Sequence, residues 1–300
     1  MKTLSTALRE AGFSGRLSEG EPLSQHCSLR VGGPAALYAE PEEMRDLETL
    51  LSALGERDLP WMILGGGTNV LFPDGGYPGC VVRLQGSFRE FDVDEEGEVD
   101  AGAGAATQVL FAAAARIGLT GMEFAAGIPG TLGGAVRMNA GTGTGSIADV
   151  VQRIQILKGG ILSWKEREEL AFAYRRLTLS PGSVITRVNL KLARDDARAV
   201  LARGNRIMEG RRSSQPLELP SAGCWFLNPR DDSAGRLIEK AGLKGRRIGG
   251  AEVSAVHANF LVNVGGAASS DFIELAEEIR TAVRKKFGIL LEEEVQVVQG

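Results

Sequence analysis

Cysteine and histidine are scarce in this chain of 300 residues, which has three cysteines and two histidines. Cys27, Cys80 and Cys224 are odd in number and far apart, a pattern that indicates neither a disulfide framework nor a metal-binding pair. His26 and His257 alone cannot supply a histidine-based metal site or a histidine relay. We therefore expect no resident metal and a reducing compartment.

Long apolar runs and an excess of positive charge are also missing. Residues 1–15 contain no unbroken apolar core of signal-peptide length, and no later stretch approaches a membrane span. The formal net charge of −4 argues against a basic surface for nucleic acid, although a few cations would suffice for a small anionic ligand. The sequence thus predicts a cytoplasmic protein with no nucleic-acid and no membrane partner, and we expect a monomer.

Glycine, in contrast, is abundant, since 40 of 300 residues is about 13%, roughly twice the usual share. Much of the excess falls in short clusters. Glycine permits positive φ and lets a ligand approach backbone N–H groups, so such clusters can form an anion-binding concavity. The four clusters are Arg30–Gly33, Gly65–Leu71, Gly102–Gly104 and Gly127–Gly134.

The clusters match neither common nucleotide-binding motif. The sequence has no Gly-x-x-x-x-Gly-Lys-[Ser/Thr] loop, which argues against phosphoryl transfer by a P-loop. Gly141–Gly145 contains alternating glycines, but no strand-to-helix step is predicted there, so a Rossmann fold does not fit. What remains is a cofactor with a diphosphate held by several separate loops.

Helical and strand periodicities alternate along the chain. Residues 41–54 predict a helix, and residues 61–64 predict a buried strand that ends in Gly65. A second helix should present Val109, Leu110, Ala113, Ala114 and Ile117 as its apolar face. The stretch 127–145 is poor in apolar runs and predicts irregular structure outside the core. A last helix is predicted to start at Asp271, with Glu274 in capping-box position, and to end at Gly288.

These elements predict an α+β chain in three parts. Residues 1–78, which 289–300 can rejoin, form the first part, and residues 79–193 form the second. The polar run 194–196 marks a boundary, after which 194–288 form a C-terminal α/β domain.

Three motifs, in order, resemble the FAD-binding segments of the UDP-N-acetylenolpyruvoylglucosamine reductase family. They are His26–Pro34, Leu64–Leu71 and Ala126–Ala135. Further downstream, Gln215–Leu217 and Pro220–Pro229 match the family's substrate segment, and Val253–Phe260 and Leu291–Val295 complete the set. The resemblance extends over nearly the whole chain, and its length is similar to that of the shorter subtype of the family.

The resemblance implies a two-part FAD-binding fold of the vanillyl-alcohol-oxidase (PCMH-like) type plus a C-terminal substrate domain. It implies non-covalent FAD, with NADPH as co-substrate. The small-molecule partner would be a UDP-sugar, UDP-N-acetylglucosamine enolpyruvate. After NADPH leaves, hydride would pass from the flavin to the vinyl carbon of this substrate, yielding UDP-N-acetylmuramate for peptidoglycan synthesis.

The resemblance also identifies three candidate catalytic residues. Hydride addition to an enol-ether acid builds negative charge beside the carboxylate, so the reaction needs a cation there and a positioned acid for the neighbouring carbon. Arg175 matches the family's arginine, and a guanidinium suits a carboxylate. Glu294 matches its glutamate, which we expect to be protonated or paired with Arg175. Cys224 stands where relatives often have a proton-donating serine, and a thiol is the stronger acid.

The remaining candidates bind cofactor or substrate. The resemblance implies cofactor binding by two groups of loop residues. They are Arg30, Gly65, Gly66, Gly67, Thr68, Asn69, Val70, Leu71, Gly127, Ile128, Pro129, Gly130, Thr131, Gly133 and Gly134. It implies substrate binding by Asn228, Arg211, His257 and Asn259. Alternatively, His257 and Asn259 are core residues whose polar groups are hydrogen-bonded within the fold. The alternative for Cys224 is a buried structural cysteine.

Two departures from the family pattern concern the substrate diphosphate. Leu227 stands where relatives often have lysine, and Gly143 stands where many have tyrosine, so Lys240 or Lys244 could substitute. Two alternatives to the reductase remain open: an oxidase with the same flavin fold, and a non-catalytic nucleotide-binding protein. The loop 65–71 lacks the histidine that often attaches flavin covalently, which disfavours the oxidase. The joint presence of Arg175, Cys224 and Glu294 disfavours the binder.

Overall fold

The computed structural model describes residues 3–300 and consists of two compact units. The first unit comprises Met1–Glu19, Leu37–Gly66 and Gly79–Gly210. The second comprises Gly20–Ala36, Gly67–Pro78 and Arg211–Gly300. The finer division at residues 78, 193 and 288 stays a prediction.

A five-stranded sheet dominates the first unit. Its strand order is β12-β11-β15-β7-β6, and every neighbouring pair is antiparallel. The sequence Lys158-Gly159-Gly160 between two strand-like runs predicts a hairpin, and β11 and β12 form it, with Lys158 opposite Ile161. The five strands are β6 (Phe91–Val93), β7 (Glu98–Gly102), β11 (Val151–Lys158), β12 (Ile161–Glu166) and β15 (Val184–Lys191).

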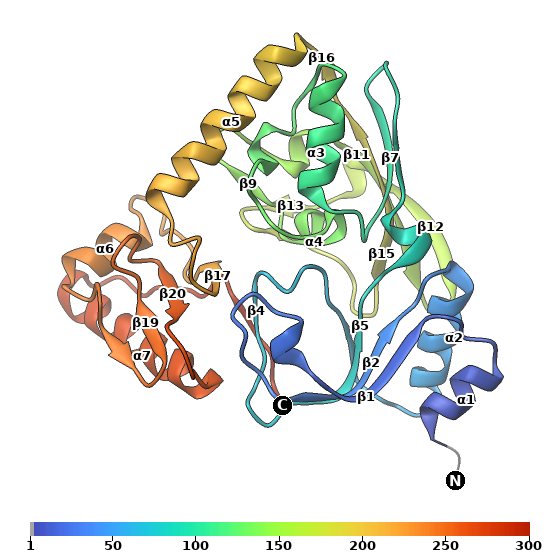
Figure 1. Cartoon of the computed structure of the whole chain (residues 1–300), viewed down its shortest axis with the longest axis horizontal. Coiled ribbons are helices and arrows are strands. Elements are labelled where there is room, and N and C mark those ends of the chain that lie inside the picture. The colour runs from blue at the N-terminus through green and yellow to red at the C-terminus, as the bar shows by residue number, and fades with distance from the viewer. Residues whose placement is uncertain (1–2) are drawn as a thin grey trace. The chain divides into compact units, whose positions relative to one another are not determined.

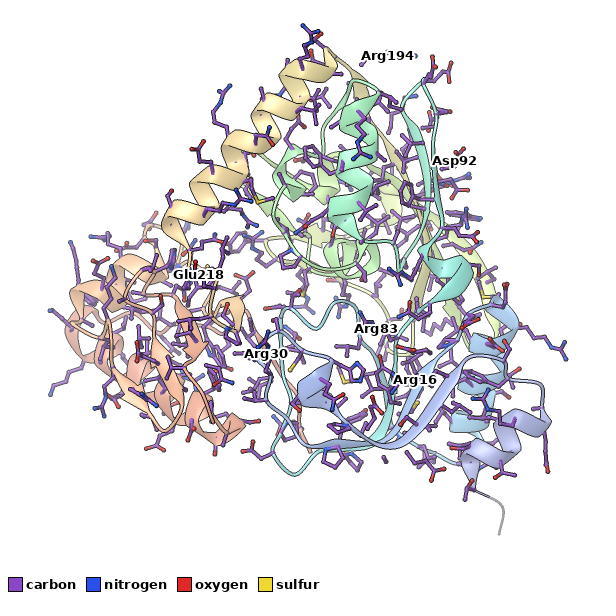
Figure 2. The ribbon with its side chains drawn as sticks, in the orientation of Figure 1. Arg16, Arg30, Arg83, Asp92, Arg194 and Glu218 are labelled. Carbon is purple, nitrogen blue, oxygen red and sulfur yellow. The ribbon has the colours of Figure 1, made fainter. Side chains whose placement is uncertain are left out.

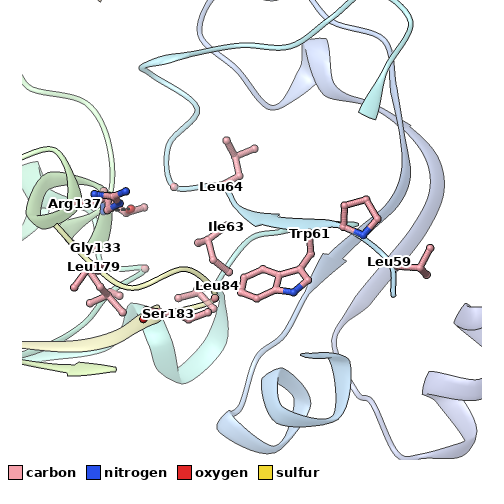
Figure 3. A pocket seen from close by; sticks show the side chains of 18 of the residues that line it. Leu59, Trp61, Ile63, Leu64, Leu84, Gly133, Arg137, Leu179 and Ser183 are labelled. Carbon is pink, nitrogen blue, oxygen red and sulfur yellow. Dashed lines mark hydrogen bonds between the residues drawn. The ribbon is translucent and has the colours of Figure 1, made fainter. Parts of the chain in front are cut away.

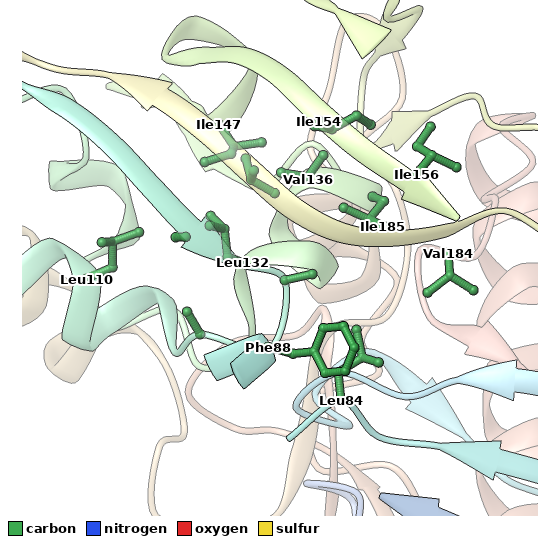
Figure 4. Close-up of a cluster of buried hydrophobic side chains, with 14 of the residues drawn as sticks. Leu84, Phe88, Leu110, Leu132, Val136, Ile147, Ile154, Ile156, Val184 and Ile185 are labelled. Carbon is green, nitrogen blue, oxygen red and sulfur yellow. The ribbon is translucent and has the colours of Figure 1, made fainter. Parts of the chain in front are cut away.

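Two helices pack against this sheet (Figure 1), namely α3 (Thr107–Arg116) and α4 (Leu132–Arg137). Leu110 of α3 and Leu132 and Val136 of α4 are fully buried in the core that Figure 4 shows. The predicted apolar face of α3 was partly wrong, because Val109 is 56% exposed and Ile117 is 42% exposed. The helix buries the predicted Leu110 and Ala114 together with Thr107 and Ala115, and the small alanines allow a close approach.

The helix α4 contradicts the prediction that 127–145 lies outside the core. Its apolar residues are few, but Leu132, Ala135 and Val136 lie on one side at helical spacing and are buried. The helix is only 6 residues long, too short for a clear periodic signal. Short pairs complete this part of the chain: β8 (Leu119–Thr120) with β16 (Ala193–Arg194), β9 (Gly141–Thr142) with β10 (Gly145–Ser146), and β13 (Phe172–Ala173) with β14 (Arg176–Leu177).

A further sheet has four strands in the order β1-β2-β5-β3, with β3 and β5 parallel. The helix α2 (Met44–Gly55) buries Leu47, Leu50 and Leu54, as its periodicity predicts. The strands are β1 (Arg16–Pro22), β2 (Pro34–Glu40), β3 (Trp61–Ile63) and β5 (Tyr77–Val82); α1 (Leu4–Glu10) precedes them, and α5 (Ala197–Ser214) follows the five-stranded sheet.

The second unit contains a four-stranded antiparallel sheet in the order β17-β20-β19-β18. Its elements are β17 (Ser221–Cys224), β18 (Arg247–Ile248), β19 (Ala251–Val253), β20 (Phe260–Asn263), α6 (Ala234–Lys240) and α7 (Ser269–Phe287). The last strand, β21 (Gln296–Val297), pairs in parallel with β4 (Val70–Leu71). Sequence position 296 is thereby brought beside position 70.

The start of α7 differs from the prediction, because the helix begins two residues earlier than Asp271. The Asp271 carboxylate accepts hydrogen bonds from the backbone N–H groups of Ala268 and Gly250. It therefore caps the helix from inside the first turn, and Glu274 takes no capping-box role. The predicted end is confirmed, since Gly288 adopts a φ of 70° after Phe287.

Between residues 3 and 300, none of the helices combines the length and the apolar character needed to cross a bilayer. Within the same range, His, Cys, Asp and Glu side chains form no cluster of three suited to a metal ion.

Candidate functional site

A pocket of about 610 Å³ lies within the first unit (Figure 3). We call it the glycine-lined pocket. Backbone from three of the four glycine clusters reaches it, through Gly65, Gly104, Gly133 and Gly134. Its other walls are largely apolar. They include Leu59, Pro60, Trp61, Ile63, Leu64, Leu84, Leu179, Val184 and Ile185, with Asp58, Thr131, Arg137 and Ser183 as polar members.

This pocket suits a flavin nucleotide in size and in chemistry. Its volume falls within the range of about 300–1,000 Å³ that small-molecule sites occupy. Gly65 approaches so closely that a Cβ there would lie 2.6 Å from Thr131 Oγ1, so this backbone contact requires glycine. Apolar walls suit ring systems, while bare backbone suits a diphosphate. Figure 3 shows Trp61 and Leu59 on one side and Arg137 and Gly133 on the other.

Strained backbone is concentrated in the candidate site segments. Among residues 3–300, the non-glycine residues with positive φ are Arg30, Asp58, Asn139 and Arg175. Asp58 lines the pocket, Arg30 follows the 3-10 turn Leu23–Gln25 in a candidate flavin segment (Figure 2), and Asn139 follows α4. Such conformations cost about 1–3 kcal/mol each and cluster at functional sites.

Arg175 occupies the tip of a hairpin in the first unit. Ala173 pairs with Arg176, so Tyr174 and Arg175 form a two-residue turn in which Arg175 has a φ of 55°. Its guanidinium Nη1 donates to the Gly141 carbonyl at 2.8 Å, and the Asn139 amide donates to the Ala173 carbonyl at 2.9 Å. The hairpin is thereby tied to the loop that follows α4.

In the second unit, two candidate flavin segments pack backbone against backbone. Ser28 N–H donates to the Gly67 carbonyl, and Gly33 N–H donates to the Pro73 carbonyl, each at 2.9 Å. A Cβ at Gly67 would lie 2.0 Å from the His26 carbonyl oxygen, which no side chain allows. Glycine at position 67 is thus required by chain packing, whatever a ligand adds.

Cys224 ends β17 and is half-buried. The pairing of β17 with β20 is irregular between Ser221 and Cys224, where Gly223 has a φ of 79°. Such a bulge re-aims the next side chain, a common device beside active sites. The Ser221 carbonyl accepts a hydrogen bond from Ser28 Oγ at 2.6 Å, which ties this strand to a candidate flavin segment.

Glu294 lies in the C-terminal segment of the same unit. Its N–H donates to the Trp225 carbonyl at 2.8 Å, one residue after Cys224. Its own carbonyl accepts a hydrogen bond from Asn69 Nδ2 at 3.1 Å. The backbone of Glu294 is therefore fixed between the strand that carries Cys224 and the loop 67–71.

The candidate substrate residues differ in what they bind. Asn259 is buried, at 2% exposure. Its side-chain Oδ1 accepts a hydrogen bond from Phe226 N–H at 3.0 Å, and its Nδ2 donates to the Phe226 carbonyl at 2.8 Å. Asn228 Oδ1 accepts from Ala234 N–H at the start of α6 and is exposed. Arg211 is half-buried near the end of α5. Asn259 thus supports the strand after Cys224 rather than projecting into solvent.

His257 is a neutral hydrogen-bond acceptor in this structure. Burial lowers the pKa of its imidazole, and the nearby Lys244 ammonium lowers the pKa further. Its Nδ1 accepts from Asn259 N–H at 3.2 Å, and its ring meets Phe260 edge-on. Of the two lysines considered as substitutes at the diphosphate, Lys244 forms an ion pair with Glu239 at 2.8 Å.

Several pocket residues were not predicted from the sequence. Trp61 could have been found, because it begins β3, the strand that leads into the glycine cluster at Gly65. Leu179 and residues 182–185 approach the pocket only because β15 lies in the sheet beneath it, and no local motif marks them. Asp58 and Arg137 likewise have no signal beyond their nearness to predicted segments.

Two family models match this chain. The FAD binding domain matches residues 35–160, and the C-terminal domain of UDP-N-acetylenolpyruvoylglucosamine reductase matches residues 215–298. The reductase of Geotalea uraniireducens is 42% identical over 288 residues, which cover 96% of this chain and 96% of that protein. The reductase of an Anaeromyxobacter species is 46% identical over 293 residues, covering 96% of this chain and 91% of that protein.

Solved structures agree with these matches. The crystal structure of UDP-N-acetylenolpyruvylglucosamine reductase from Thermus caldophilus superposes with a TM-score of 0.82 at 38% identity, covering 95% of this chain and 99% of that one. The D396N variant of BBE-like 1 from Physcomitrella patens, at 15% identity and a TM-score of 0.51 over 94% of this chain and 60% of that one, shares the fold alone. The predicted α+β flavin-binding fold with a C-terminal domain, and the FAD cofactor, are confirmed. The chain therefore belongs to the UDP-N-acetylenolpyruvoylglucosamine reductase family.

Proposed function

We propose that this chain reduces the enolpyruvyl group of UDP-N-acetylglucosamine enolpyruvate to the lactyl ether of UDP-N-acetylmuramate, in the cytoplasm and as a monomer. The observation that carries the proposal is family membership over 96% of the chain together with a glycine-lined pocket of flavin size. Bound FAD would supply the transfer of hydride from NADPH to the vinyl carbon. In the first unit, Gly65, Thr131, Gly133 and Gly134 would hold the cofactor through backbone and hydroxyl groups.

The chain's own residues would stabilise charge and deliver the proton. Arg175 would bind the substrate carboxylate, where negative charge develops during the reaction, through its planar guanidinium. The Cys224 thiol would donate its proton to the carbon next to that carboxylate, leaving a thiolate that is later reprotonated from solvent. Glu294 would act as a neutral acid or as the partner of Arg175. Asn228 and Arg211 would contact the sugar nucleotide, with His257 and Asn259 shaping that region.

Anaerobic titration tests this function directly. NADPH should bleach the yellow flavin of the purified protein, and the enolpyruvyl sugar nucleotide should restore the colour with formation of UDP-N-acetylmuramate. A flavin that bleaches but is reoxidised only by oxygen would point to an oxidase of the same fold. A colourless protein that ignores added FAD would contradict both flavin activities.

A further inference from the structure

Three segments of the second unit meet at Glu294: the loop 67–71, the strand that follows Cys224, and the C-terminal segment 292–298. We infer that Asn69 is a positioning residue that holds Glu294 in place, so that the C-terminal segment acts as a clasp between the flavin loop and the strand of the proton donor. This inference rests on the proposed function, because it assigns Asn69 a role through the proposed catalytic acid.

The contacts on the loop side begin at Asn69. Its side-chain Nδ2 donates to the Glu294 carbonyl at 3.1 Å, and its own carbonyl accepts from Gln296 N–H at 3.1 Å. Beyond Asn69 the two segments continue as a parallel ladder, with Gln296 opposite Val70 and Val297 opposite Leu71. The Asn69 amide therefore extends this ladder by one donor, to the residue that carries the carboxyl group.

The contacts on the other side reach the strand after Cys224. Glu294 N–H donates to the Trp225 carbonyl, and Leu227 N–H donates to the Glu292 carbonyl, each at 2.8 Å. Phe226 and Glu293 form an antiparallel bridge between these two bonds. Trp225 is fully buried and stacks on Phe272 at 5.6 Å, so this strand is a rigid support. Both backbone polar groups of Glu294 are thus held, and the loop-side bond comes from a side chain.

Positioning of this kind has a measurable consequence. A shift of about 1 Å in a reacting group can lower the rate about 10²-fold, even when the altered residue is remote from the chemistry. Loss of the Asn69 donor leaves the Glu294 carbonyl with only the longer, exposed bond from Gln296 Nε2, while the bond of Glu294 N–H to the Trp225 carbonyl stays in place. The position of the carboxyl group would then be less tightly fixed on the side of the loop. The half-reaction that needs the acid should slow, while flavin reduction by NADPH should not.

The test uses the flavin-loaded protein and follows the two half-reactions separately by anaerobic stopped flow. For Asn69→Ala, saturated with FAD so that any change in FAD affinity is measured separately, we expect flavin reduction by NADPH to proceed and reoxidation by the enolpyruvyl substrate to be slowed about 10²-fold. Asn69→Leu, which is of similar size, uncharged and without the donor, should behave alike and covers the case in which the alanine variant folds poorly. Gln296→Ala is the matched control, because its exposed side chain makes a longer bond of 3.4 Å to the same carbonyl.

A double-mutant cycle separates action through Glu294 from a general structural effect. If Asn69 acts through Glu294, Asn69→Ala in a Glu294→Gln background should slow reoxidation no further than Glu294→Gln alone. Additive losses, unchanged reoxidation in Asn69→Ala, or an effect confined to FAD affinity and flavin reduction would each overturn the inference. A wild-type flavin that the substrate fails to reoxidise would instead contradict the proposed function.

Discussion

Arg175 has a backbone conformation that arginine disfavours, at the tip of a hairpin. A strained residue of this kind points to a role for its side chain. The second position of its hairpin turn, with a φ of 55°, favours glycine or asparagine. Arginine there is strained by about 1–2 kcal/mol. The bond from Nη1 to the Gly141 carbonyl offsets part of this cost. The presence of arginine at this turn in this chain is therefore explained better by its guanidinium than by the fold.

Replacement of Arg175 by glycine and by alanine should separate these two contributions. Both variants lose the guanidinium, so kcat should fall about 10²–10³-fold in each, as for loss of a charge-stabilising donor. Alanine keeps the strain and glycine removes it, so Arg175→Gly should be more stable than Arg175→Ala by about 1 kcal/mol. Steady-state kinetics and urea unfolding measure the two effects. Equal stabilities would contradict the strain argument, and retained activity would contradict the catalytic role.

Cys224 is the residue at which proton donation can be tested by the smallest change. Cys224→Ser replaces the thiol by a hydroxyl, which is also a proton donor, and should retain substantial activity. Cys224→Ala should still allow reduction of the flavin by NADPH but should stall reoxidation by the substrate. Single-turnover absorbance of the flavin distinguishes these half-reactions. Equal activity of the alanine variant and the wild type would remove Cys224 from the mechanism.

The segment from Cys224 to Leu227, which follows β17, is held by hydrogen bonds to a buried side chain rather than by a continuous β-ladder. Asn259 bonds both the N–H and the carbonyl of Phe226, and the Asn259 carbonyl accepts from Trp225 N–H at 2.7 Å. The pairing of β17 with β20 ends at Cys224, opposite Phe260, so Phe226 has no ladder partner on that side. The asparagine amide replaces the missing partner, since it carries a donor and an acceptor side by side.

Asn259→Ala should therefore destabilise the protein strongly. It leaves a buried N–H and a buried carbonyl without partners, at about 1–3 kcal/mol each, so we expect a loss of about 2–4 kcal/mol in the free energy of unfolding. Asn189→Ala is the control, because the partners Arg153 and Asp100 of Asn189 lie at the surface and can rehydrate. A loss below about 1 kcal/mol for Asn259→Ala would mean that water replaces the amide.

Elements with strong periodicity were predictable from the sequence, and those fixed by distant contacts were not. The helix α2 and the hairpin of β11 and β12 follow from local pattern alone. The helix α4 was missed because its burial depends on the sheet beneath it. The family motifs suggest Arg175, Cys224 and Glu294 as catalytic residues, which stays a prediction, but no local signal shows that Asn69 bonds a residue 225 positions away. Non-local hydrogen bonds of this kind require the folded topology.

Across the whole chain, the predicted flavin segments belong to both compact units. Gly65, Thr131, Gly133 and Gly134 belong to the first unit, and Arg30 and 67–71 belong to the second. A ligand that binds only the native chain adds about 2.7 kcal/mol of stability at a hundredfold excess over its Kd. If FAD binds all these segments, that stabilisation must appear in both units and not in one alone.

Hydrogen exchange with and without FAD tests this expectation. Amides in 67–71 and in 131–134 should both exchange more slowly when FAD is bound, because opening of either segment then requires release of the ligand. Riboflavin, which lacks the diphosphate and the adenosine, is the control and should protect the glycine-lined segments less. Protection of 131–134 without protection of 67–71 would show that the glycine-lined pocket suffices to hold the cofactor. The loop 67–71 would then be held in shape by its packing against His26 and by its bond to Glu294, not by the flavin.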